Sequence, residues 1–87
     1  MDEEERQARQ ELMILDAVFQ AMDRRDEVFR IVEDSEDEDE ARRRVGQLLG
    51  VGELGARFVL DLQVKGLTRD RRRRLGSRAS ELRSKFP

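Results

Sequence analysis

The chain has 87 residues, of which 44% are charged and 37% hydrophobic, and its formal net charge is −2. A chain of this length forms one small domain with a thin hydrophobic core, and such chains often gain stability by oligomerisation. The sequence contains no Cys, His, Tyr or Trp. Disulfides are therefore excluded, and the commonest general base, the thiol and phenolic nucleophiles and most transition-metal ligands are missing. We expect a protein that is not an enzyme and uses no cofactor.

The two halves of the chain carry opposite charge. Residues 1–40 contain 16 acidic and 5 basic residues, whereas residues 41–87 contain 4 acidic and 13 basic residues. A nucleic-acid-binding domain usually has a basic face without such a counterweight. The pattern predicts that the two halves attract each other, within one copy or between copies. The acidic start and the lack of a long apolar run predict a cytoplasmic protein without membrane contact.

Helical spacing of apolar residues continues through the chain and predicts an all-α fold of about five helices. The first helix is expected from about Glu4 to Met22. Its heptad positions are Leu12, Leu15, Phe19 and Met22, and Ile14 and Val18 widen the apolar stripe.

A break at residues 24–26 predicts a second, short helix with Asp26 as its N-cap. Its apolar residues are Val28, Phe29, Ile31 and Val32.

Seven acidic residues lie between Glu33 and Glu40. Carboxylates favour the start of a helix because they face its exposed N–H groups. Ser35 and Glu38 have the spacing of a capping box, which predicts a third helix from about Glu36 to Leu49 with Gly50 ending it.

The fourth helix is expected from about Glu53 to Lys65, with Leu54, Phe58 and Leu62 recurring every four residues. Gly66 should end it, and Thr68 should cap a fifth helix from about Arg69 to Lys85. The heptad positions of this last helix are Leu75, Ala79, Leu82 and Phe86.

The apolar stripes at both ends of the chain predict that its terminal helices pair as a short antiparallel coiled coil. In this prediction residues 1–24 and 69–87 form an arm, and residues 25–68 form a helical knob that the arm braces. The acidic side chains between Asp2 and Glu11 would then face Arg78, Arg83 and Lys85. This charge pattern would select the register of the two helices.

Five segments of the sequence form an ordered series with characteristic spacing. They are Leu15-Asp16-Ala17-Val18, Met22–Val32, Glu40-Ala41-Arg42, Leu49–Leu54 and Val59–Thr68. Their order and spacing, over about residues 6–82, resemble the DNA-cleaving subunits of the DNA gyrase and topoisomerase IV family of type IIA topoisomerases. The resemblance implies the tip of a long antiparallel coiled-coil arm. In that family two tips meet across a two-fold axis and form the exit gate, or C-gate, through which the transported DNA segment leaves.

The sequence also departs from the family. The DNA-cleaving Tyr of the family lies in a separate upstream domain, and this chain has no Tyr. Gly52, Gly55 and Gly66 replace better helix formers, Arg69-Asp70 replaces a Gly-Leu pair, and residues 71–74 are unusually basic. The chain is either a free-standing relative that kept only the gate or a piece of a larger protein. The acidic leader after Met1 favours the free-standing relative.

These features lead to one main hypothesis and two alternatives. The main hypothesis is homodimerisation through the knob, with Val51, Leu54, Phe58 and Leu62 as interface anchors, although the same residues could form the core of one protomer. One alternative is a regulator that binds the gate of a full-length DNA-cleaving subunit of gyrase. The other is a small, non-specific DNA-binding protein that uses Arg69, Arg71, Arg72, Arg73 and Arg74.

Two further kinds of site, a helix-turn-helix and a calcium-binding loop, fit the sequence poorly. A helix-turn-helix around residues 48–53 would read bases with Glu53, Gly55 and Arg57, which are poorly suited to that task. The acidic stretch at residues 33–40 lacks the Gly and the closing Glu of an EF-hand. We therefore predict no metal site.

Overall fold

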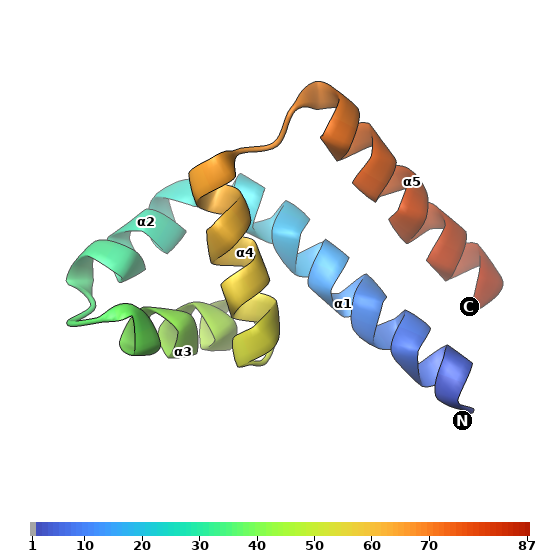
Figure 1. Cartoon of the computed structure of the whole chain (residues 1–87), viewed down its shortest axis with the longest axis horizontal. Helices are drawn as coiled ribbons and strands as arrows, with labels where there is room; N and C mark the ends of the chain where they lie inside the picture. Colours follow the sequence, from blue (N-terminus) through green and yellow to red (C-terminus); the bar gives the residue numbers. More distant parts are fainter. Residues whose placement is uncertain (1) are drawn as a thin grey trace.

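The computed structural model describes the backbone of residues 2–87 and the side chains of these residues apart from 63–65. This part of the chain contains α-helices and no strand, which confirms the predicted all-α class. Helices α1 and α5 lie side by side with both termini at the same end, and the other helices gather at the opposite end (Figure 1). The helices are α1 (Glu3–Asp23), α2 (Arg25–Asp34), α3 (Glu38–Leu49), α4 (Glu53–Lys65) and α5 (Arg69–Lys85).

The predicted end of α4 and the predicted start of α5 are confirmed. Gly66 follows α4 with a φ of 77°, a backbone conformation that favours glycine. Thr68 is the N-cap of α5, because its Oγ1 accepts a hydrogen bond of 3.1 Å from the backbone N–H of Arg71. A side-chain acceptor here satisfies one of the free N–H groups of the first turn.

The prediction that Asp26 caps α2 is wrong. Helix α2 already begins at Arg25, and the single residue Arg24 separates it from α1. The Arg24 side chain makes no capping hydrogen bond and instead donates to the carboxylate of Glu27 at 2.8 and 3.2 Å. Asp26 lies in the first helical turn, where a carboxylate still favours the helix through its dipole.

The prediction that Ser35 caps α3 is also wrong. The Ser35 hydroxyl donates to the carbonyl oxygen of Ile31 at 2.6 Å and so completes the end of α2. Asp37 is the N-cap of α3, because its Oδ1 accepts from the backbone N–H of Glu40 at 2.9 Å. The Glu40 carboxylate in turn accepts from the N–H of Glu36 at 2.6 Å. The capping pattern of the acidic stretch therefore lies two residues later than predicted.

Helices α1 and α5 pair antiparallel around a small hydrophobic cluster. Its buried members are Ala8 and Leu15 from α1 and Ala79 and Leu82 from α5, and Leu12, Leu75 and Phe86 pack against them. These include most of the heptad positions that the sequence marks. The pairing is consistent with the predicted antiparallel coiled coil, and we call this pair of helices the arm.

Charged side chains connect the same two helices along their edges. Arg78 binds both carboxylate oxygens of Glu11 at 2.9 and 3.0 Å, and Lys85 contacts Glu4 at 3.3 Å. Arg83 pairs with Asp16. The hydrogen bond from Arg78 lowers the pKa of Glu11 below its usual value, with the charge of Arg78 adding to the effect. The acidic first half and basic second half of the chain thus meet within one copy.

A second, larger core lies at the other end of the molecule. It joins α2, α3 and α4 to the last turns of α1 through the buried residues Ala17, Val18, Ala21, Val28, Val45, Leu49, Ala56, Val59 and Leu62. We call this part the knob. The predicted boundary placed residues 1–24 in the arm, but residues 17–21 of α1 contribute to the core of the knob. One continuous helix therefore belongs to both parts and fixes the knob to the arm.

Two glycines shape the turn between α3 and α4. Gly50 ends α3 with a φ of 71°, as the sequence predicts for a residue that follows the helix. Gly46 lies within α3, and a Cβ atom there would be 2.8 Å from the carbonyl oxygen of Val51. The backbone N–H of Val51 also donates to the carbonyl oxygen of Gly46 at 2.9 Å. The absence of a side chain at Gly46 lets α4 begin directly against α3.

Candidate dimerisation surface

The four residues predicted as interface anchors divide into two groups. Leu54 is 74% exposed and Phe58 is 37% exposed, so both present apolar surface to solvent. Leu62 is buried in the core of the knob, and Val51 is half-buried against the same core. The protomer itself therefore uses Leu62, and only Leu54 and Phe58 remain as prominent exposed anchors on α4.

The geometry of α4 explains this division. Leu54 and Phe58 lie one turn apart on the same face, which carries them outward. Val59 and Leu62 face α1 and line a small pocket together with Val18 and Ala21. Helix α4 thus buries one face against α1 and α3 and leaves an apolar stripe on its other side.

Helix α2 adds a second exposed apolar pair that the sequence analysis did not identify as part of a site. Phe29 is 44% exposed and Val32 is 38% exposed, whereas Val28 is buried and Ile31 half-buried. The sequence signal for this exposure was the number of apolar residues in α2. Four of them in one short helix exceed what a single inward face can cover.

A groove of about 390 Å³ connects these helices on the knob. Phe29 and Val32 of α2 and Leu60 of α4 give it apolar walls. Charged groups of both signs lie on its lining: Glu38 and Arg42 come from α3, and Arg57 and Asp61 from α4. A surface with apolar walls and charges of both signs has the composition of a protein–protein interface.

Exposed apolar residues are concentrated on the knob. Among the residues that the structure describes, the large hydrophobic side chains classed as exposed are Met13, Phe29, Val32, Leu54 and Phe58. Only Met13 belongs to the α1 segment outside the knob. The other four lie on α2 and α4 of the knob, and a surface that exposes several large apolar side chains is a candidate interaction surface.

The acidic stretch at residues 33–40 contributes mainly local contacts. Asp34 pairs with Arg44 at 3.0 Å, and Asp39 pairs with Arg42. Asp37 and Glu40 accept the backbone hydrogen bonds at the start of α3. Within the described part of the chain, no group of three or more His, Cys, Asp or Glu side chains is arranged to hold a metal ion.

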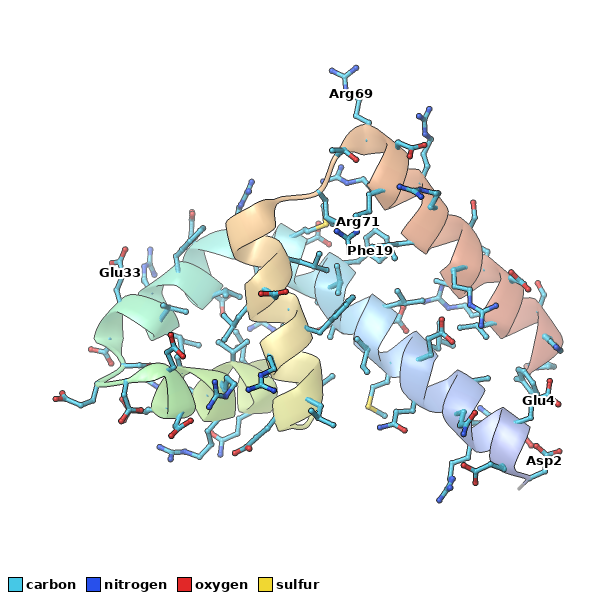
Figure 2. All side chains as sticks on the ribbon, in the orientation of Figure 1. Asp2, Glu4, Phe19, Glu33, Arg69 and Arg71 are labelled. Atoms are coloured by element: carbon cyan, nitrogen blue, oxygen red, sulfur yellow. The ribbon has the colours of Figure 1, made fainter. Side chains whose placement is uncertain are left out.

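The five arginines predicted as a DNA-contact site all lie in the first two turns of α5. Arg73 and Arg74 contact the carboxylate of Asp70 at 3.9 and 3.1 Å. Arg69 points away from the body of the molecule, whereas Arg71 points inward, toward α1 (Figure 2). The fifth, Arg72, reaches toward the Met22 sulfur at 4.0 Å. The helix thus spreads these arginines over different faces, as expected for consecutive residues.

Comparisons with known proteins add no assignment to these observations. No protein-family model matches the chain, and neither the curated proteins nor the solved structures contain a match to it. None of the helices, over the residues described, is long and apolar enough to span a lipid bilayer.

Proposed function

We propose that the chain is a non-catalytic homodimerisation module, related to the C-gate of the DNA gyrase and topoisomerase IV family. The observation that carries this proposal is the concentration of exposed apolar side chains on the knob. Leu54 and Phe58 of α4 and Phe29 and Val32 of α2 would be covered when two knobs meet.

The architecture supports a dimer at this end of the molecule. The arm encloses its own cluster of Ala8, Leu15, Ala79 and Leu82, so its contacts are satisfied within one copy. The knob has a core of its own but keeps additional apolar surface. Interfaces of permanent homodimers resemble a hydrophobic core divided between two chains, and the surface of α2 and α4 has that character.

The groove gives such a dimer a means of fixing its geometry. In a two-fold interface the same surface occurs on both copies, so a charged group on one copy can meet its opposite on the other. Glu38, Arg42 and Arg57 line the groove, and both signs are therefore available for pairing across the axis. Apolar contacts would supply affinity, and these charges would select the relative orientation of the copies.

The solution mass of the protein tests the proposal. We expect light scattering to give twice the protomer mass of 10.2 kDa over a wide dilution series, at both low and high salt. Persistence at high salt is expected because apolar contacts are not screened by ions. A monomer at all concentrations would overturn the proposal and would favour a different protein, such as a full-length gyrase chain, as the occupant of this surface.

A further inference from the structure

Helix α5 is held to the rest of the molecule on one side only. Within the described residues α1 is the only helix that α5 packs against, whereas α4 packs against both α1 and α3. Figure 1 shows α5 at the edge of the molecule, joined to α4 by an extended connection. The position of α5 therefore depends on its contacts with α1 and on the connection at residues 66–68.

The apolar part of the contact between α5 and α1 is small. Ala79 and Leu82 are the buried residues of α5, and they meet Ala8 and Leu15 of α1. Leu75 packs against this cluster and also against the core of the knob. The core of the knob, in contrast, draws buried residues from four helices. Because buried apolar area supplies most of the stability of a fold, α5 is held less firmly than the helices of the knob.

The connection before α5 has the features of a pivot. Leu67 packs against the core of the knob and keeps the connection in place there. Gly66 has a φ of 77°, and a glycine can adopt a wide range of backbone conformations. Hinges are short segments at the ends of helices or strands that absorb such a change of direction.

Helix α5 is not expected to persist away from α1. An isolated helix of 17 residues with this composition is at best marginally stable in water. Arg69 and residues 71–74 also place positive charge at the helix N-terminus, where the helix dipole disfavours it. When α5 leaves α1 it should therefore unfold, and its backbone N–H groups should then exchange with solvent.

Opposite charge adds to the attraction between the two helices. Helix α1 contains six acidic and two basic residues, and α5 contains eight basic and two acidic residues. Ion pairs cross from α5 to α1 between Arg78 and Glu11, Arg83 and Asp16, and Lys85 and Glu4. Each of these side chains is at least 39% exposed. Dissolved salt screens exposed charges, so it should weaken this contact more than the apolar core of the knob.

We propose that α5 is a salt-sensitive strap on α1. It leaves α1 and unfolds as one unit, pivoting at residues 66–68, while the knob stays folded. Opening uncovers the apolar side of α1 formed by Ala8, Leu12 and Leu15, and high salt favours the open form. The strap does not use the exposed apolar residues of α2 and α4, so this inference is independent of the proposed dimerisation.

Hydrogen exchange of single backbone amides, followed by NMR in the native protein, tests this inference. Amides in the last three turns of α5 should share one protection factor, at least about tenfold lower than that of the best protected amides of α3. Raising the NaCl concentration from about 0.05 to about 0.5 M should lower the protection of α5 at least about threefold. The protection of α3 should change much less.

A pair of double variants identifies the charges responsible. Arg78→Gln/Arg83→Gln removes two contacts with α1 and should lower the protection of α5 at least about threefold at low salt, with a weaker response to added salt. The matched control Arg73→Gln/Arg74→Gln removes the same charge from the same helix. These two arginines contact Asp70 within α5, so their replacement should not lower the protection of α5.

Three outcomes would overturn the inference. Equal protection of α5 and α3, with one common response to salt, would mean that the molecule opens only as a whole. Protection that declines gradually toward Lys85 would indicate fraying of the helix end instead of a unit. An equal loss in the two double variants would remove the ion pairs with α1 from the explanation. Repeating the measurement on Leu54→Glu, which should be monomeric, keeps any protection of the knob by dimerisation out of the comparison.

Discussion

Arg78 of α5 and Glu11 of α1 lie 67 residues apart in the sequence and form a two-point contact, with Nε to Oε1 at 2.9 Å and Nη2 to Oε2 at 3.0 Å. Lys85 and Glu4, one heptad further along each helix, form the corresponding contact at 3.3 Å. Both pairs fit the same antiparallel register. The charge asymmetry of the sequence thus has a physical use in the arm, where it favours one alignment of α1 on α5.

The contact between Glu11 and Arg78 predicts an acid-sensitive contribution to stability. Because Arg78 lowers the pKa of Glu11 below 4.5 in the folded state, the contribution is present above that pH and is lost as the pH falls through the folded pKa. Both side chains are 44% exposed, so we expect Glu11→Gln to cost less than ~1 kcal/mol at neutral pH. Urea unfolding should show this difference shrinking as the pH falls through the folded pKa of Glu11 and vanishing below it.

The control for this experiment is a double-mutant cycle. Arg78→Gln and the double variant should show that most of the cost of Glu11→Gln depends on Arg78. A cost that is unchanged by acidification, or that persists when Arg78 is already replaced, would contradict the assigned contact.

Replacement of Leu54 should break the proposed dimer without unfolding the protomer. Leu54 is 74% exposed in one copy, so Leu54→Glu places no charge in the protomer core. In a dimer the new carboxylate would be buried against the partner, and the dissociation constant should rise at least about tenfold, or ~1.4 kcal/mol. Light scattering measures the change in mass, and circular dichroism checks the helix content.

Met13→Glu is the matched control for this variant. Met13 is 53% exposed on the α1 segment outside the knob, and the same substitution there should leave the dimer intact. A dimer that survives Leu54→Glu, or one that dissociates equally in both variants, would remove Leu54 from the interface.

The close approach of Gly46 to the start of α4 predicts a cost for adding a single methyl group. A Cβ at this position would be 2.8 Å from the backbone oxygen of Val51, so the two helices must move apart. After the gain of ~1 kcal/mol in helix propensity, we expect Gly46→Ala to lower the free energy of unfolding by about 1–2 kcal/mol. Gly76→Ala within α5 is the control, since its Cβ would meet only the Phe19 ring at 3.9 Å, an ordinary van der Waals distance, and it should not lower the free energy of unfolding. Equal stability of the two variants in urea would contradict the described turn.

Asp37 and Asp39 carry the same charge, but only Asp37 caps α3, so their replacement should have different effects on stability. Asp37→Ala removes the acceptor for the backbone N–H of Glu40 and should cost about 1 kcal/mol. Asp39→Ala removes only an ion pair with Arg42 on the surface and should cost less than about 0.5 kcal/mol. Thermal unfolding of both variants measures the difference, and a larger loss for Asp39→Ala would place the cap elsewhere.

Sequence alone determined the local structure of this protein to a large extent. The spacing of apolar residues located the helices, and residues that end or cap a helix, such as Gly50, Gly66 and Thr68, located their boundaries. This works because helix ends depend on a few neighbouring residues. The heptad positions of α1 and α5 also identified most of the side chains that pack between them. Ser35 shows where local reasoning fails. Both Ser35 and Asp37 can cap α3, and the choice depends on the hydrogen bond that Ser35 makes to the preceding helix.

Only the tertiary structure decided which apolar residues of the knob are exposed. Leu54, Phe58 and Leu62 drift around α4 by about 40° at each step, so they share one broad face in the sequence pattern. The packing of α1 against α4 covers Leu62 and leaves Leu54 and Phe58 uncovered. The same is true of Phe29 and Val32, whose exposure follows from the way α2 lies on α3. Burial depends on contacts between segments distant in sequence, and the spacing of residues within one helix does not contain that information.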